Sequence, residues 1–214
     1  MGKCFPLFVE LAGREVLIFG GVGHAVAKIG RFAEFDARVT VVAPVLDATV
    51  TALAQEGKIH TVCGDFADFM ALLPERSPVL VYAVLDDGQA GAALLEYCKK
   101  RGIPLNVEDR SQYCTITFPS VISRGSLTVG ICTGGASPTV SKKLREQIEP
   151  LLPEATGEIL DWLQALRPEI QQNGALSPRA RTLLWRRLSD IAFAENRTLS
   201  RAEVQALIDA ACDQ

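Results

Sequence analysis

The sequence predicts an α/β fold: a Rossmann-like parallel sheet, followed by a small strand-containing dimerisation segment and a C-terminal helical domain. Three observations carry this prediction. Short apolar runs alternate with helical patterns over the first hundred residues, this rhythm changes after residue 113, and only helical spacing remains after residue 150. We therefore expect three parts, a nucleotide-binding domain at 1–113, the dimerisation segment at 114–150 and the helical domain at 151–214.

Composition excludes several classes of protein. Hydrophobic residues make up 48% of the 214 residues and charged residues 22%, which is typical of a globular protein and not of a disordered one. A net charge of −3 gives no basic footprint for nucleic acid or an anionic membrane, and no apolar run approaches the roughly 18 residues that cross a bilayer. The six cysteines form no Cys-x-x-Cys pair, which favours reduced thiols in a cytoplasmic protein. His24 and His60 are isolated, so no metal site is expected.

The strands of the sheet are predicted from continuous apolar runs and from the residues that end these runs. Val16-Leu17-Ile18-Phe19 is continuously apolar, which is typical of a strand buried on both faces, and it ends at two glycines. Strand–helix alternation with short connections predicts a parallel sheet with right-handed crossovers. We expect strands at 16–19, 39–42, 58–62, 79–84 and 103–107, and helices at 23–35, 48–55 and 90–100.

The second half begins with two strands that no helix separates. These are expected at 115–118 and 126–131, with Arg124-Gly125 as the nearby turn. A helix is then expected at 139–151, because Ser137 is a natural N-cap and Pro138 suits the first helical position. The remaining apolar residues repeat at helical spacing, and Ser200 begins a capping box.

The strongest motif is a glycine-rich turn between the first strand and the first helix. Gly20, Gly21, Val22 and Gly23 allow a tight turn and let a pyrophosphate approach the N-terminus of the helix. The match to G-x-G-x-x-G is imperfect, and the alternative is a tight turn without a cofactor. The interpretation we follow is a nucleotide site.

Two further segments belong to the expected cofactor site. Ala43 and Pro44 end the second strand, where an acid usually holds the ribose, and neither Arg nor Lys is present there to hold a 2′-phosphate. NAD is therefore expected rather than NADP. Leu85 and Asp86 follow the fourth strand and complete the set, with ordinary turn chemistry as the alternative for Asp86.

Asn106-Val107-Glu108-Asp109 lies at the carboxyl end of the fifth strand. Ligands of open α/β sheets bind at that edge, and a carboxylate there can act as a general base. We expect Asp109 to be that base. A solvated turn acid is the alternative.

Small residues and cations gather at the start of the predicted helix at 139–151. Thr133, Gly134 and Ser137 precede the helix, and Lys142 and Arg145 lie on it, a combination that suits an anion. The alternative is an exposed helix face, since Lys142 and Glu146 are spaced as an i, i+4 pair.

Taken together these motifs resemble one family over nearly the whole chain: precorrin-2 dehydrogenase, the N-terminal module of siroheme synthases. The resemblance is carried by Phe19-Gly20-Gly21 with Lys28, Val41-Val42-Ala43-Pro44, Asn106-Val107-Glu108-Asp109, Phe118-Pro119-Ser120, and Thr133-Gly134-Gly135-Ala136-Ser137-Pro138 with Leu144-Arg145. Their order and spacing both agree with the family pattern.

The resemblance implies NAD-dependent oxidation of precorrin-2 to sirohydrochlorin in siroheme biosynthesis, with ferrochelation to siroheme in some members. It also implies a homodimer, Asp109 as the base, and Asn106 with the Thr133–Arg145 residues on the tetrapyrrole. The alternatives are a chelatase or a tetrapyrrole-binding protein with a degenerate nucleotide site, and another Rossmann enzyme.

Four positions depart from the family pattern. Val22 stands where a third glycine is usual, Ala27 where an Arg precedes the lysine, and Leu85 where a Thr follows the fourth strand, while an Asn expected near Gly91 is missing. All four lie on the nucleotide side. They predict weaker NAD binding than an intact glycine loop gives.

Overall fold

A computed structural model describes residues 4–212. The chain divides into two compact units, residues 1–118 and 119–214, and each is described by itself. The three-part division expected from the sequence stays a prediction.

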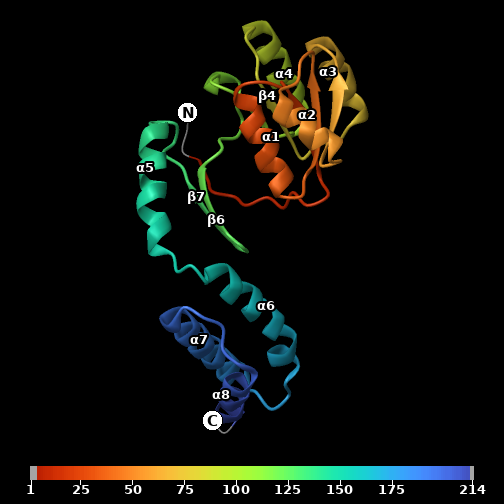
Figure 1. The fold of residues 1–214 in the computed structure, drawn as a ribbon. Coiled ribbons are helices and arrows are strands. Elements are labelled where there is room, and N and C mark those ends of the chain that lie inside the picture. Colours follow the sequence, from red (N-terminus) through yellow and green to blue (C-terminus); the bar gives the residue numbers. More distant parts are fainter. Residues whose placement is uncertain (1–3, 213–214) are drawn as a thin grey trace. The chain divides into compact units, whose positions relative to one another are not determined.

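The first unit is built on a five-stranded parallel sheet in the order β3-β2-β1-β4-β5 (Figure 1). Every pair in it is parallel, as the strand–helix alternation predicts. The strands are β1 (Glu15–Phe19), β2 (Arg38–Ala43), β3 (Ile59–Cys63), β4 (Leu80–Ala83) and β5 (Leu105–Val107). Parallel alignment brings all five carboxyl ends to one edge, which we call the carboxyl edge.

Helices cover both faces of this sheet. On one face, α1 (His24–Glu34) and α2 (Ala48–Gln55) pack through residues such as Ile29 and Val50. On the other, α3 (Phe66–Leu72) and α4 (Gly88–Arg101) pack through residues such as Phe69 and Leu94. Two single 3₁₀ turns, η1 (Leu73–Glu75) and η2 (Ser111–Tyr113), complete the unit.

The first unit differs from the sequence-based expectations in two places. Helix α3 was not predicted, although the Asp65 carboxylate accepts from the backbone N–H groups of Ala67 and Asp68 and so caps it. The strand expected at 115–118 is irregular chain. The N–H groups of Thr115 and Ile116 both donate to the carbonyl of Leu105, which anchors this segment beside β5 without extending the sheet.

The second unit begins with an antiparallel hairpin of β6 (Ser120–Arg124) and β7 (Leu127–Ile131). The turn is Gly125-Ser126, one residue beyond the expected Arg124-Gly125, and the strand that pairs with β7, 120–124, was not predicted. The hairpin contacts α5 (Pro138–Ile148), and β7 also contacts α6 (Figure 1). Ser137 caps α5 and Pro138 opens it, as expected.

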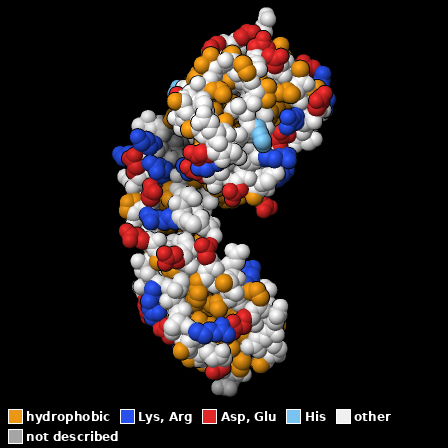
Figure 2. Space-filling model, turned by 45° about the vertical axis from the view of Figure 1, so that its right-hand side comes forward, with side chains coloured by type: hydrophobic (Ala, Val, Ile, Leu, Met, Phe, Trp, Pro, Cys, Tyr) orange, Lys and Arg blue, Asp and Glu red, His pale blue; other side chains and the backbone are white. Residues whose placement is uncertain are grey.

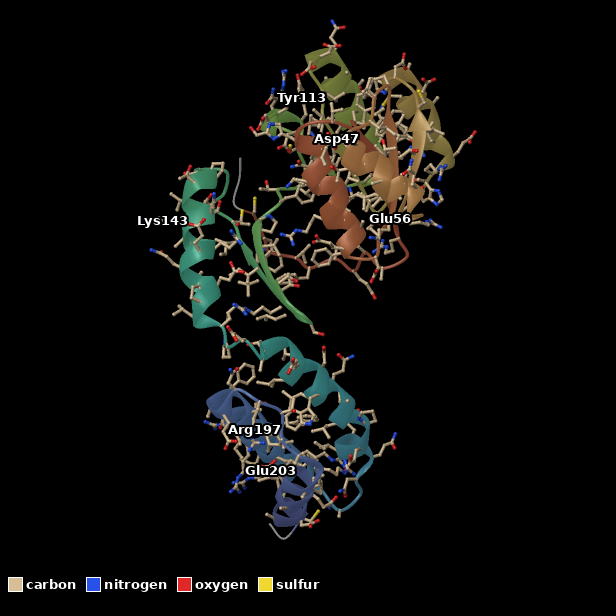
Figure 3. All side chains as sticks on the ribbon, viewed as in Figure 1. Asp47, Glu56, Tyr113, Lys143, Arg197 and Glu203 are labelled. Carbon is tan, nitrogen blue, oxygen red and sulfur yellow. The ribbon has the colours of Figure 1, made fainter. Side chains whose placement is uncertain are left out.

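The rest of the second unit is helical, as predicted. It comprises η3 (Glu149–Leu151), α6 (Thr156–Gln172), α7 (Pro178–Glu195) and α8 (Arg201–Cys212), and the last three enclose a core that includes Ile159, Leu188 and Ile208. The N–H of Glu203 donates to the Ser200 hydroxyl, and the Ser200 N–H donates to the Glu203 carboxylate, which is the predicted capping box. Arg197 pairs with that carboxylate at 2.8 Å (Figure 3). Within the described residues, no helix combines the length and apolarity needed to span a membrane.

Candidate functional site

The carboxyl edge of the first unit gathers the predicted cofactor-binding and catalytic residues. Gly20–Gly23 follows β1, Ala43 ends β2, Leu85 and Asp86 follow β4, and Asp109 follows β5. Strand register, not proximity in sequence, brings these segments to one edge: Phe19 pairs with both Val42 and Ala83.

The glycine loop separates into a packed half and an open half. A Cβ at Gly21 would lie 2.7 Å from the carbonyl oxygen of Val45 and 2.6 Å from a methyl of Leu46, so the loop there is pressed against the start of the β2–α2 connection. Gly23 has a φ of +59°, no atom lies within 4 Å of its Cβ position, and no side chain caps α1. The side chain of Val22, which is 49% exposed, stands beside this open half.

This loop fits a dinucleotide pyrophosphate. A helix start without a side-chain cap presents the positive end of the helix dipole, and the missing Cβ at Gly23 leaves room for close approach. The N–H groups of Ala25 and Val26 donate to the carbonyls of Val22 and Gly23 within the loop.

At the end of β2, Ala43 is buried and Pro44 exposed. The Asp47 carboxylate accepts a hydrogen bond from the Thr49 N–H at 2.8 Å and so caps α2. Asp47 is labelled in Figure 3.

The residues after β4 contribute mainly through their backbone. The Leu85 side chain is buried in the core, so a contact with a cofactor would use its main chain. The carbonyl of Asp86 accepts from the Arg110 guanidinium at 2.9 Å. At Gly91 an added Cβ would lie 2.6 Å from the ring of Tyr113, so the ring leaves no room for a side chain at this position.

Asn106 and Asp109 have different surroundings. The Asn106 amide donates to the carbonyl of Ile116 at 3.1 Å, so it fastens the chain beside β5. The Cys114 thiol does the same, since it accepts from the Val107 N–H at 3.2 Å, and burial raises the pKa of this thiol. Asp109 has a φ of +54° and is exposed, and its carboxylate has no hydrogen-bond or ion-pair partner among residues 4–212. An acid so presented is available to a ligand.

Sequence reasoning did not single out Glu108, which the structure places among several polar side chains at the carboxyl edge. Its carboxylate accepts a hydrogen bond from the buried Tyr82 hydroxyl at 2.8 Å and lies 3.9 Å from Nδ1 of His24. Lys28, on the same helix as His24, interacts with this carboxylate electrostatically and lies 4.7 Å from the ring centre of Phe118. The available signal was Tyr82: a tyrosine in an otherwise apolar buried strand needs a partner for its hydroxyl.

Charge and burial shift two groups in this cluster. Burial raises the pKa of Tyr82, and the carboxylates of Glu108 and Asp109 raise it further, so Tyr82 stays a protonated donor. Burial lowers the pKa of Lys28, while Glu108 opposes that shift. Glu108 and Asp109, the two acids at the end of β5, therefore both raise the pKa of the Tyr82 hydroxyl.

The second unit holds the other predicted residues, and the structure places them at the start of α5. The Thr133 hydroxyl donates to the carbonyl of Ser137 at 3.1 Å, and the Ser137 hydroxyl accepts from the Val140 N–H at 3.3 Å. Gly134 turns the loop with a φ of +64°. Because both hydroxyls serve the loop itself, an anion here would rely on backbone N–H groups and nearby cations.

The predicted cations on α5 are paired along the helix. Lys142 lies 4.0 Å from Glu146 and Arg145 lies 3.1 Å from Glu149. The i, i+4 pair considered from the sequence is therefore present. Lys143, exposed on the same helix, has no such pair among residues 4–212 (Figure 3). Figure 2 shows basic and acidic side chains interspersed over the face in view. Across residues 4–212, no three His, Cys, Asp or Glu side chains gather as a metal site requires.

Known proteins resemble this chain over most of its length. Siroheme synthases from Methylococcus capsulatus and Neisseria meningitidis are 33% and 31% identical over 92% and 93% of the chain. The chain spans about two fifths of these relatives, 41% in each case. The solved structure of SirC, precorrin-2 dehydrogenase, has the same fold, with a TM-score of 0.71, 22% identity, and coverage of 99% of this chain and 100% of that one.

Two family models match in succession. One, described as "Sirohaem biosynthesis protein central", matches residues 124–150, which hold most of the β6–β7 hairpin and α5. The other, described as "Putative NAD(P)-binding", matches residues 7–120. That range is more than half of the chain and contains both the open glycine loop and the acids after β5, and the chain belongs to this NAD(P)-binding family.

Proposed function

We propose that the chain catalyses the NAD-dependent oxidation of precorrin-2 to sirohydrochlorin in siroheme biosynthesis. One observation carries the proposal: an uncapped, glycine-lined helix start and an unpaired carboxylate, Asp109, lie on the same edge of one parallel sheet. A dehydrogenase needs a hydride acceptor and a base at one place. The siroheme synthases supply the substrate class, because they align with nearly all of this chain.

NAD, rather than NADP, is the proposed cofactor. A 2′-phosphate at the end of β2 requires a cation, and the sequence has neither Lys nor Arg between Ala43 and Gly57. The next cation, Lys58, pairs with Glu56 at 2.8 Å. We expect NAD to bind more tightly than NADP, by calorimetry on the same preparation.

In the mechanism we propose, the chain's residues bind, orient and accept a proton. The bound nicotinamide supplies the hydride acceptor. Asp109 takes a proton from the tetrapyrrole, and Asn106 holds the strand end from which Asp109 projects. The loop Thr133–Ser137 with Lys142, Lys143 and Arg145 is assigned to carboxylates of the substrate.

We also propose a homodimer, built through α5 and the hairpin beside it. No residue of α5 is buried, and its Val140 and Leu144, four residues apart, are exposed apolar side chains. An amphipathic helix with an uncovered apolar stripe needs a partner surface. Light scattering at micromolar concentration should give the dimer mass, and Leu144→Glu should reduce it to the monomer. A monomeric wild-type chain contradicts this assignment.

The deciding experiment mixes the chain with precorrin-2, with and without NAD, and follows the absorption spectrum. The proposal expects conversion to sirohydrochlorin only with NAD, together with stoichiometric NADH. A spectrum that changes on binding but never converts favours a tetrapyrrole-binding protein. A second mixture contains sirohydrochlorin and ferrous iron instead of precorrin-2. Formation of siroheme there, with no conversion of precorrin-2 in the first mixture, favours a chelatase with a degenerate nucleotide site.

A further inference from the structure

Glu108 is a carboxylate that the mechanism above leaves unused. It is held on one side by the buried Tyr82 hydroxyl, at 2.8 Å, and it faces His24 on the other, at 3.9 Å. The side chain of Glu108 is 23% exposed and that of His24 is 75% exposed. These three groups therefore lead from the sheet interior to solvent.

Asp109 belongs to the same electrostatic cluster. Its charge and that of Glu108 both act on the Tyr82 hydroxyl, and the two acids are adjacent in the chain. A base must touch its substrate, and in this proposal the bound tetrapyrrole covers the Asp109 carboxylate, which is exposed in the free chain. The proton that Asp109 accepts then needs another way out.

We propose that Glu108 and His24 form a proton relay that carries the proton taken up by Asp109 to bulk water. This inference rests on the proposed dehydrogenase function and adds the route by which the site is reset. Tyr82 and Lys28 are positioning residues in it: the hydroxyl fixes one carboxylate oxygen, and the ammonium stabilises the negative charge of Glu108.

The steps balance without any further reactant. In the oxidation the substrate loses a hydride, with two electrons, to the nicotinamide and one proton to Asp109. The O–H bond on Asp109 then breaks as one forms on Glu108. Glu108 in turn gives the proton to Nδ1 of His24, and the imidazolium releases a proton from Nε2 to water. No electron moves in the relay.

The geometry suits a relay better than a fixed ion pair. At 3.9 Å the His24–Glu108 contact is longer than a hydrogen bond, and the imidazole is free enough to rotate between the carboxylate and solvent. Contacts of this kind are commonly loose before the substrate binds. The charged and titratable groups facing Glu108 are His24 and Lys28 from α1, Tyr82 from β4 and the Cys114 thiol that follows η2, with Asp109 beside it in the chain.

The test is chemical rescue. In a weakly buffered solution, His24→Ala should oxidise precorrin-2 at least about tenfold more slowly than the wild type. This loss is smaller than the roughly 10²–10⁴-fold loss expected when a general acid or base itself is removed, because Asp109 is still present. Adding imidazole should restore the rate with saturation. The matched control is His60→Ala, because His60 is the second of the two histidines and is also exposed. This variant should behave as the wild type with or without imidazole.

Glu108→Gln tests the inner step. Its amide oxygen can still accept from Tyr82, so we expect a melting temperature close to the wild type and unchanged NAD binding by calorimetry. Its rate should fall about tenfold or more and should not recover in imidazole, because the break precedes His24. Glu96→Gln, on the exposed Glu96–Lys100 pair, is the control.

The outcomes separate the two proposals. If the wild-type chain does not reduce NAD with precorrin-2, the dehydrogenase proposal fails and the relay with it. If the wild type is active and His24→Ala matches it in weak buffer, or stays slow in imidazole, the relay alone is wrong. A Glu108→Gln protein that loses NAD binding or melts far earlier would assign Glu108 to the fold.

Discussion

The two halves of the glycine loop should respond differently to the same added methyl group. In Gly21→Ala the new Cβ would be 2.7 Å from a backbone oxygen, which cannot move aside as a flexible side-chain end can. Overpacking of this kind costs about 1–3 kcal/mol. For a unit of 118 residues this corresponds to a fall in melting temperature of about 4–12 °C.

In Gly23→Ala the new Cβ meets nothing within 4 Å, and only the backbone is strained, because φ +59° with ψ −126° is a conformation that residues with a side chain rarely adopt. That strain costs about 1–3 kcal/mol. The methyl group enters the space assigned to the pyrophosphate, so NAD affinity should fall at least about tenfold, or about 1.4 kcal/mol.

Calorimetry measures both quantities on each protein: the melting temperature by scanning, and the NAD dissociation constant by titration. We predict that both variants melt below the wild type and that Gly23→Ala is the weaker binder of NAD. A Gly21→Ala protein that melts with the wild type would refute the close approach to Val45. Undiminished NAD affinity in Gly23→Ala would refute the placement of the phosphate.

Three further substitutions follow from the same edge of the sheet. Asp109→Asn keeps a residue type that tolerates a φ of +54°, so we expect an unchanged melting temperature and a turnover of precorrin-2 lower by about 10²–10⁴-fold; turnover near the wild-type rate would contradict its role as the base. Val22→Gly should tighten NAD binding by calorimetry, because it removes a half-exposed side chain beside the open half of the loop. Lys28→Met should alter the pH dependence of stability. The folded state lowers the pKa of Lys28 below 10.5, so the wild-type unfolding free energy should rise with pH up to that value, and the variant should lack this rise in parallel thermal melts.

Much of the first unit could be predicted because its signals are local. Buried runs between glycines and prolines give β1, β2 and β4, and Gly102 marks the end of α4 with the left-handed conformation usual for that position. Helix α3 escaped prediction because it is short and its capping box uses Asp68 where Glu or Gln is usual.

The hairpin shows where a local signal was available but was not used. Thr115–Phe118 has the β-branched alternation of a strand, yet its backbone is drawn to Leu105. The turn decides the pairing: Arg124 lies opposite Leu127, so only two residues, Gly125 and Ser126, connect the strands. A two-residue Gly-Ser connection predicts Ser120–Arg124 as the partner of β7.

The candidate site also contains residues that local sequence signals reveal and one that they do not. Asp109 and the glycine loop could be found because strand ends and glycines are visible in the sequence. Glu108 could not, because its contacts with Tyr82 and His24 depend on the register of β4 against β5, in which Tyr82 lies opposite Asn106. Glu108 lies two residues after Asn106, so it is on the same face of the sheet and reaches α1. The spacing of residues in the sequence does not reveal how β4 is aligned with β5.

A double-mutant cycle on the two acids would separate a relay from two independent bases. If Asp109 passes its proton to Glu108, the two residues act in series, and once Asp109→Asn has removed the first acceptor, Glu108→Gln has little left to slow. The double variant should then turn over precorrin-2 at about the rate of Asp109→Asn alone. Two independent acids would instead multiply their losses, as distant sites do. We expect the first result, because Glu108 directly follows the end of β5 beside Asp109 and lies 2.8 Å from the Tyr82 hydroxyl and 3.9 Å from His24. Steady-state NADH formation by the four proteins in weak buffer measures the coupling, and losses that simply multiply would mean that Glu108 does not serve Asp109.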